Sequence, residues 1–223
     1  VLHISADVAY AVSRYWAVTG DEVYMETAGY ALIVECARFA VSAFKWSEEK
    51  GAYVIDSVMG PDEYHYHVNN SFFTNYLLRW CIAYALTWVD RCCLPTVRED
   101  EVSQWRAVSE QVYLPWMIVD GISIPEEFEG YADLAQALPR DGKGRGPRFA
   151  NESERRTAQK LLNLDTNVVK QADGILLLSM FAGDFPDEVK RAAFNFYETR
   201  TVHESSLSYG PHARVAADID ALD

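Results

Sequence analysis

The stretch VMGPDEYHYHVNNSFFTNY, Val58 to Tyr76, gathers two carboxylates, two histidines, three asparagines and three tyrosines into nineteen residues. Gly60-Pro61 is a turn signal, and apolar sequence with a helical pattern follows from about Ser71. Solvated loops favour Lys, Ser and Gly and lack this density of aromatic residues. A pocket that binds a polar molecule is built from this mixture of side chains, so the stretch predicts one wall of a binding cleft.

The bulk composition indicates a globular protein with a sizeable core. The chain has 223 residues, of which 49% are hydrophobic, and these values argue against disorder. No apolar run reaches about 18 residues without a charge, so no transmembrane helix is expected. A net charge of −13 disfavours nucleic acids and anionic membranes as partners, because like charges repel.

The N-terminus and the cysteines favour a cytoplasmic location. VLHISADVAY has no basic region followed by an apolar one, so no signal peptide is expected. It also lacks an initiating Met, which indicates a fragment or a continuation of upstream sequence. Cys36, Cys81, Cys92 and Cys93 show no CxxC spacing or zinc pattern, and buried free thiols in a reducing cytosol are the favoured interpretation.

Helical periodicity dominates the chain and predicts an all-α fold of packed helical hairpins. KGAYVIDSV is expected to form a short strand or extended connection, and residues 114–150 are expected to be irregular. Pro186 is expected in the first turn of its helix, with two acidic residues favourably placed near the positive end of the helix dipole. The expected helices cover about residues 4–18, 22–44, 71–91, 100–113, a segment from near Asn151, 168–181, 186–198 and 208–221.

Asp62-Glu63 is the first candidate for chemistry. A carboxylate among Pro61, tyrosines and histidines is expected to be partly desolvated, which raises its pKa and suits it to donate a proton near neutral pH. The alternative is an acidic loop that caps the following helix. His65 and His67 beside these acids could also bind a metal, but no third spaced ligand is present, so hydrogen-bonding histidines are favoured and no metal is expected.

Two further polar segments interrupt the apolar pattern. In VVKQADG, Lys170 is either paired at a wet cavity or extends to the surface, and Gln171 offers a donor and an acceptor suited to sugar hydroxyls. TVHESSLSYGPHA, residues 201–213, precedes a helix, where free N–H groups and Ser hydroxyls bind anions or form a serine cap. A Ser-His-Asp triad is set aside because the GxSxG elbow is missing.

Five separated motifs together resemble glycoside hydrolase family 65. They are HISADVAYAVSRYW with TGDE, ECARF, GPDEYHYHVNNSFFTNY, KQAD, and HESSLS with its following His-Ala, in this order and spacing. The resemblance covers nearly the whole chain. It implies that residues 1–223 are part of an (α/α)6-barrel catalytic domain in a family of inverting phosphorylases of α-glucosides and some hydrolases.

The resemblance also implies roles for individual residues. The expected reaction is phosphorolysis of an α-glucoside disaccharide of the maltose, trehalose or kojibiose type to β-glucose 1-phosphate and a free sugar. Inorganic phosphate is the co-substrate, with no other cofactor. The implied residues are Glu63 as general acid, Lys170 and Gln171 holding the glucosyl unit, His65 and Asn69 lining the pocket, and Ser205, Ser206 and His212 binding phosphate.

Two alternatives remain open. Glu204 could act as the base for water in an inverting hydrolase such as a trehalase, or it could turn away and pair with a neighbouring helix. The chain could also be a non-catalytic helical subunit or fragment, because it has fewer helices than such a barrel needs. The missing barrel half is then expected from upstream sequence or another chain. Without it, an apolar face is expected to be exposed. The resemblance to the family also implies a homodimer. The basic loop Arg140–Arg148 either meets a phosphorylated sugar or is a mobile surface loop, and the second is favoured.

Overall fold

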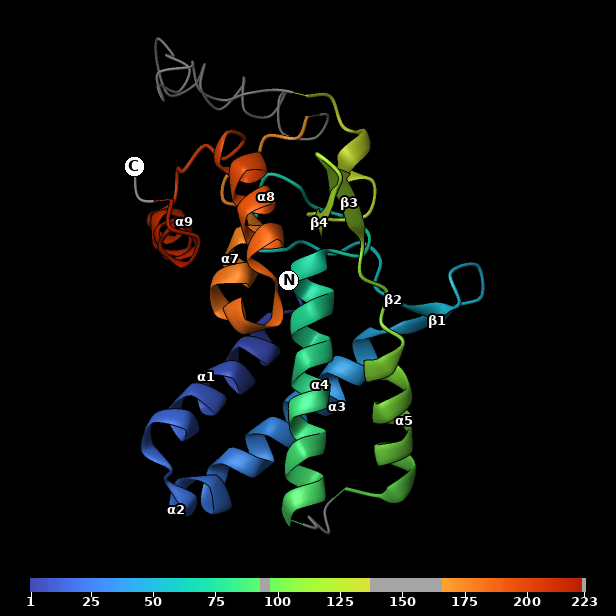
Figure 1. The fold of residues 1–223 in the computed structure, drawn as a ribbon. Helices are drawn as coiled ribbons and strands as arrows, with labels where there is room; N and C mark the ends of the chain where they lie inside the picture. The colour runs from blue at the N-terminus through green and yellow to red at the C-terminus, as the bar shows by residue number, and fades with distance from the viewer. Residues whose placement is uncertain (93–96, 137–165, 222–223) are drawn as a thin grey trace, which may run out of the picture. The chain divides into compact units, whose positions relative to one another are not determined.

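The computed structural model describes residues 1–92, 97–136 and 166–221. The chain divides into two compact units (Figure 1). Unit 1 consists of Val1–Val58 and Thr74–Leu114, and unit 2 consists of Met59–Phe73 and Pro115–Asp223. The described residues are mostly helical, as the sequence predicts.

Helices make up most of unit 1, and their ends carry the expected local signals. The first helix stops at Gly20, which has φ 59°, and Asp21 caps the next helix by accepting a hydrogen bond from the Tyr24 N–H. The expected helix over 22–44 is continuous but contains one π-helical turn. The helical elements are α1 (Ile4–Thr19), α2 (Glu22–Tyr24), the π-turn (Met25–Gly29), α3 (Tyr30–Ala43), α4 (Phe72–Cys92, whose first two residues belong to unit 2) and α5 (Glu99–Glu110).

A short antiparallel hairpin follows α3. Strand β1 (Lys45–Ser47) pairs with β2 (Ala52–Val54), with Trp46 opposite Tyr53. Strand β2 confirms the extended segment expected in KGAYVIDSV. The backbone of Tyr53 also pairs with Gln111 and Tyr113, which ties the hairpin to the end of α5.

The face of α1 that packs inside unit 1 is the one with small side chains. Ala6, Ala9 and Val12 are buried, and α1 packs along α3. The larger apolar residues, spaced at helical intervals, point outward instead. We call them the α1 apolar face: Ile4 is 56% exposed, Val8 42%, Tyr15 43% and Val18 81%. The periodicity therefore predicted the helix, and the expected exposure of an apolar face is seen on α1.

Unit 2 contains a hairpin where the sequence was expected to be irregular. Strands β3 (Trp116–Val119) and β4 (Ile122–Pro125) pair antiparallel with Val119 opposite Ile122. The two turn residues, Asp120 and Gly121, have φ of 49° and 80°, which is the geometry of a two-residue type I′ turn. The expectation for this part of 114–150 is therefore wrong. A 3-10 helix, Tyr131–Asp133, follows the hairpin.

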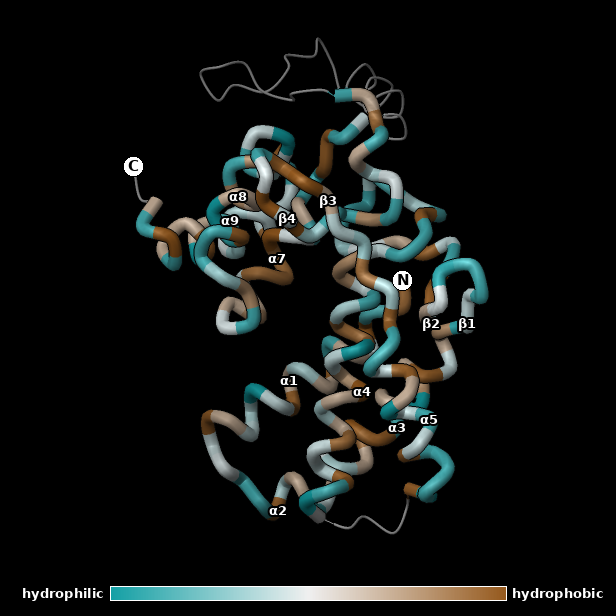
Figure 2. The backbone as a smooth tube through the Cα atoms, turned by 45° about the vertical axis from the view of Figure 1, so that its right-hand side comes forward, coloured by the Kyte–Doolittle hydropathy of each residue, from teal (hydrophilic) through white to brown (hydrophobic). Residues whose placement is uncertain are grey.

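Three helices pack against one another in unit 2: α7 (Asp173–Met180), α8 (Asp187–Glu198) and α9 (Ser206–Asp218) (Figure 1). Helix α7 is mostly apolar (Figure 2), and most of its residues are buried. It starts later than the predicted residue 168 because Val169 is extended and forms a parallel bridge with Thr201. Pro186 is the N-cap of α8, one position before the expected first turn.

Some expectations fall on residues that the structure does not describe. These are the helix near Asn151, the basic loop Arg140–Arg148 and the thiol of Cys93. Among the described cysteines, Cys36 and Cys81 are free thiols, and burial raises the pKa of Cys81. None of the helices in the described ranges combines the length and apolar character that a membrane span requires.

Candidate active site

Glu63, the predicted general acid, and Lys170, which is predicted to bind the glucosyl unit, are in direct contact within unit 2. Lys170 Nζ donates to Glu63 Oε2 at 2.6 Å, across 107 residues of sequence. The Lys170 side chain is 22% exposed, whereas the Glu63 side chain is 61% exposed. The expected desolvation of Glu63 is therefore wrong in this structure. Its neighbour Asp62 is the buried carboxylate, with 2% exposure.

Gln171 also turns toward the segment that precedes Glu63. Its Nε2 donates to the Pro61 carbonyl at 2.7 Å. Its Oε1 is buried and has no hydrogen-bond partner among the described residues. A buried acceptor normally has a donor, so this oxygen is suited to accept a hydrogen bond from a ligand hydroxyl.

The serine-rich segment meets both of the other motifs. The His203 N–H donates to the Lys170 carbonyl at 3.2 Å, next to the Val169–Thr201 bridge. Tyr64 Oη donates to Glu204 Oε2 at 2.8 Å. Glu204 is therefore directed toward the GPDEYH segment. The three motifs, far apart in sequence, converge in unit 2.

Ser205 and Ser206 lie at the start of α9. Ser205 is the N-cap, and its Oγ accepts a hydrogen bond from the Leu207 N–H at 3.2 Å. Ser206 is the first of 13 helical residues. The free N–H groups and the dipole of such a helix favour an anion. Ser205 thus has the capping role considered from the sequence, because its Oγ and carbonyl accept from the N–H groups of Leu207 and Ser208. Phosphate binding by Ser205 and Ser206 stays a prediction.

His212 lies on the buried side of α9, where its Nδ1 contacts Glu198 Oε2. His203 Nε2 is 3.5 Å from the same oxygen, and His203 Nδ1 is 2.8 Å from Ser208 Oγ. Hydrogen bonds from His203 and His212 hold the pKa of Glu198 well below its usual range. The structure thus groups His212 with Glu198 and His203, and His203 also contacts Ser208 in the first turn of α9.

The same three side chains have the composition of a metal-binding group. One potential ligand atom from each of Glu198, His203 and His212 lies within 4.8 Å of the others. The contacts that both histidines make with the Glu198 carboxylate account for this proximity. This group differs from the pair considered from the sequence, His65 and His67.

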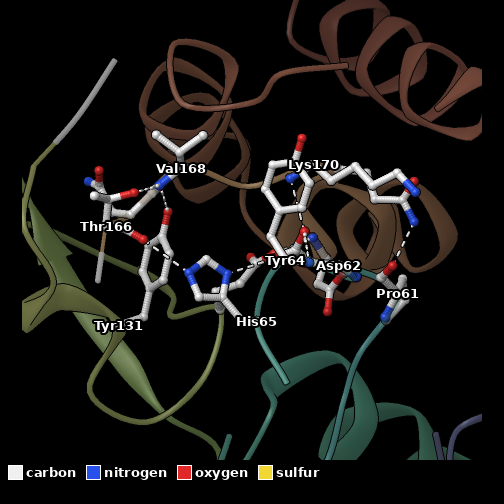
Figure 3. A network of polar contacts seen from close by, with 12 residues as sticks. Pro61, Asp62, Tyr64, His65, Tyr131, Thr166, Val168 and Lys170 are labelled. Atoms are coloured by element: carbon white, nitrogen blue, oxygen red, sulfur yellow. Dashed lines mark hydrogen bonds and ion pairs between the residues drawn. The ribbon is translucent and has the colours of Figure 1, made fainter. Parts of the chain in front are cut away.

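His65 is buried and holds the loop together (Figure 3). Its Nδ1 is 2.7 Å from Asp62 Oδ2 and its Nε2 is 3.0 Å from the Thr166 carbonyl. The ring also packs against Phe128 and Tyr131. Both ring nitrogens face protein acceptors, so the geometry favours a structural contact for His65 over the expected contact with substrate.

Asn69 is placed by its backbone, whose carbonyl accepts a hydrogen bond from the Glu129 N–H at 3.1 Å. Its expected contact with substrate stays a prediction. The loop around it is conformationally unusual, because His67 and Asn70 have φ of 58° and 50°. Left-handed conformations at non-glycine residues are concentrated in functional loops.

Two buried carboxylates near Asp62 were missed by the sequence analysis. Glu127 is 1% exposed and accepts from the N–H groups of Asp173 at 2.6 Å and Gly174 at 3.2 Å. Burial first, and the charge of Asp62 second, raise the pKa of Glu127 to about 8. Burial and the charge of Glu127 likewise raise the pKa of Asp173. The available signals were the acidic pair before Phe128 and the Asp that opens an apolar helix.

Comparison with known proteins identifies the family. A model of the glycosyl hydrolase family 65 central catalytic domain matches residues 1–223. The chain belongs to glycoside hydrolase family 65. Family 65 relatives include a kojibiose phosphorylase of Halothermothrix orenii, 35% identical over 99% of this chain. They also include a 1,2-alpha-glucosylglycerol phosphorylase of Bacillus selenitireducens, 36% identical over 100% of the chain, and a maltose phosphorylase of Bacillus subtilis, 32% identical over 98%.

The match covers part of a longer family 65 architecture. The chain spans 29%, 30% and 28% of these three relatives, respectively. A solved chain from the human microbiome, provisionally described as a kojibiose phosphorylase, superposes with a TM-score of 0.80 at 22% identity, over 97% of this chain and 30% of that one. The expected fold is confirmed: the chain is a mostly helical part of the family's (α/α)6-barrel domain.

Proposed function

We propose that this chain carries the catalytic residues for inverting phosphorolysis of an α-glucoside disaccharide of the kojibiose, maltose or trehalose type. The observation that carries the proposal is the convergence of three motifs. Glu63 contacts Lys170, and the Lys170 carbonyl accepts a hydrogen bond from His203, two residues before Ser205. A proton donor, a sugar-binding side chain and a helix start suited to an anion therefore belong to one compact unit.

Glu63 is proposed as the general acid. An inverting reaction needs an acid that protonates the departing glycosidic oxygen while the nucleophile attacks the anomeric carbon from the opposite face. Phosphate oxygen forms the new bond as the old carbon–oxygen bond breaks, and the α-linkage becomes β-glucose 1-phosphate. The leaving sugar takes the proton from Glu63. No second carboxylate is needed, because phosphate arrives already ionised.

Lys170 and Gln171 are proposed to hold the glucosyl unit. The Lys170 ammonium has three donors, so it can bind Glu63 Oε2 and a sugar hydroxyl together. The buried Gln171 Oε1 can accept from another hydroxyl. The same two contacts keep the glucosyl unit close to Glu63.

Phosphate is proposed to bind at the start of α9, through the positive end of the helix dipole and the hydroxyls of Ser205 and Ser206. His212, on the buried side of α9 and in contact with Glu198, is proposed to support this site. The α1 apolar face and the short span of the chain lead us to propose that residues outside this chain, upstream or on another subunit, complete the barrel.

An inverting hydrolase is the second candidate, and one observation favours it. The Glu204 carboxylate faces Tyr64 in the GPDEYH segment, which places a second acid near the site. In a hydrolase, Glu204 would remove a proton from the attacking water. Its hydrogen bond to Tyr64 is equally compatible with a role in shaping the phosphate site.

The full-length protein tests these candidates. Kojibiose, maltose and trehalose are each incubated with and without inorganic phosphate, and NMR identifies the anomer of any glucose 1-phosphate. The expected result is phosphate-dependent formation of the β-anomer. Glu63→Gln should abolish turnover in a folded protein, whereas Glu188→Gln, at an exposed position of α8, should not. Equal glucose release without phosphate would establish the hydrolase instead, and loss of that release in Glu204→Gln would identify its base.

A further inference from the structure

Two segments that carry the proposed site, Gly60–Glu63 and Lys170–Asp173, are cross-linked through carboxylates (Figure 3). The Asp62 N–H donates to Asp173 Oδ1 at 2.6 Å. The Lys170 N–H donates to Asp62 Oδ1 at 2.9 Å. Each segment therefore supplies one carboxylate and one backbone donor to the other, across 108 to 111 residues of sequence.

Burial shows that these carboxylates are committed to the protein. Asp62 and Asp173 are both 2% exposed. A buried carboxylate is unfavourable unless hydrogen bonds replace its lost hydration. Asp62 Oδ2 gains a further partner in His65, and its Oδ1 also accepts from the Tyr64 N–H at 3.3 Å. These side chains are therefore held in one geometry and hold the attached backbone with them.

The exposed pair next to them lacks this constraint. Glu63 is 61% exposed and Lys170 22% exposed, and ion pairs in contact with water contribute little to stability. Their ion pair alone is therefore too weak to set where their backbones lie. The buried hydrogen bonds of the Asp62 N–H and the Lys170 N–H are better suited to fix the two backbones.

We infer that Asp62 and Asp173 are positioning residues that set the separation of Glu63 and Lys170 by holding the backbone of both segments. The inference rests on the function proposed for that pair. Displacement of a catalytic group by about 1 Å can cost about 100-fold in rate. The protein thus uses two buried carboxylates to place a third, exposed one.

The surroundings of Asp173 support this role. Gly60 leaves the space that the carboxylate occupies, because a Cβ there would lie 2.0 Å from Asp173 Oδ2. Burial and the charge of Glu127 raise the pKa of Asp173, which favours its neutral form. A neutral acceptor at this position resembles an asparagine amide, whose oxygen can still receive the Asp62 N–H. Asp173→Asn is therefore a conservative variant and Asp173→Ala a disruptive one.

The test uses the full-length protein and measures both backbone protection and catalysis. Hydrogen-exchange mass spectrometry follows peptides that contain the amides of Asp62 and Lys170, and steady-state kinetics follow kcat and the KM for phosphate. We expect Asp173→Ala to lose protection at Asp62 and to lower kcat about 10- to 100-fold, with the KM for phosphate changed less than about threefold. Asp173→Asn should restore both. Asp133→Ala, at an exposed position of the 3-10 helix Tyr131–Asp133, is the matched control and should behave as wild type.

The outcomes separate this inference from the proposed function. If Asp173→Ala has wild-type kcat per folded molecule, or if Asp173→Asn is as impaired as Asp173→Ala, the inference is overturned. If Asp173→Ala does not fold, Asp173→Ser makes the same test, because serine suits a helix start but is too short to reach the Asp62 N–H. Absence of any turnover in the wild type would refute the proposed function, while loss of Asp62 protection in the variant would still show the cross-link.

Discussion

Substitution of Gly60 by alanine probes the packing between the segments Gly60–Glu63 and Lys170–Asp173. A Cβ at this position would lie 2.0 Å from Asp173 Oδ2, 3.1 Å from Asp173 Cγ and 3.2 Å from Ser71 Oγ. The Asp173 side chain is buried and tied to the Asp62 N–H, so it cannot rotate into solvent. The new methyl group therefore has to displace either the carboxylate or the loop.

Two costs contribute to the expected loss of stability. Overpacking a buried site costs about 1–3 kcal/mol. Leaving the buried Asp62 N–H without its acceptor costs a further 1–3 kcal/mol, roughly. We expect Gly60→Ala to lower the free energy of unfolding by about 2–4 kcal/mol, less than the full sum, since the two costs are partly alternatives.

Urea unfolding, monitored by hydrogen exchange of peptides from unit 2, measures this loss of stability. Gly183→Ala is the control, because a Cβ at Gly183 meets no atom within 4 Å and its φ is not positive. Asp173→Ala provides a double-mutant cycle: once the carboxylate is gone, adding Gly60→Ala should cost less than about 1 kcal/mol. Equal stability of Gly60→Ala and Gly183→Ala, or full additivity in the cycle, would refute the steric argument.

Three other predictions concern side-chain contacts and pH. Tyr64→Phe removes the donor to Glu204 and should lower kcat/KM for phosphate about threefold to tenfold, whereas Tyr66→Phe, at a half-exposed ring, should not. The folded-state pKa of Glu127, about 8, exceeds its ordinary value of 4.5. The free energy of unfolding should therefore fall as pH rises between these values, by up to about 1.4 kcal/mol per pH unit. In urea titrations at several pH values, Glu127→Gln should flatten that slope. The pKa of Glu198 is depressed, so the stability that this group contributes is present above about pH 4.5 and is lost on acidification. In thermal melts, Glu198→Gln should therefore be less stable than wild type at about pH 6. The difference should shrink toward about pH 3.

Helix positions were predictable from the sequence because their signals are local. The end of α1 follows from Gly20 and the start of α2 from the Asp21 cap, each read within a few residues. The β3–β4 hairpin was missed although Asp120-Gly121 is a strong two-residue turn signal. Strands β3 and β4 have four residues each, which is the shortest run in which strand alternation can be recognised.

Helix faces and buried networks depend on contacts that local patterns do not encode. The large apolar residues of α1, such as Val8 and Val18, recur at helical intervals, yet Ala6 and Ala9 are the buried ones. Small side chains allow close packing along α3, while the larger ones remain exposed in this chain. Likewise, nothing near Asp173 in sequence shows that it binds the Asp62 N–H 111 residues away.

The environments of Asp62 and Glu63 distinguish their roles without reference to any relative. From the sequence, either of two adjacent carboxylates could donate a proton. In the structure, Asp62 is 2% exposed and its oxygens accept from Tyr64, His65 and Lys170, so a substrate cannot reach it. Glu63 is 61% exposed and bound to a lysine side chain rather than to the backbone. Different environments suit chemically equivalent groups to different functions. Of these two, only Glu63 has the exposure that the proposed protonation of a glycosidic oxygen requires.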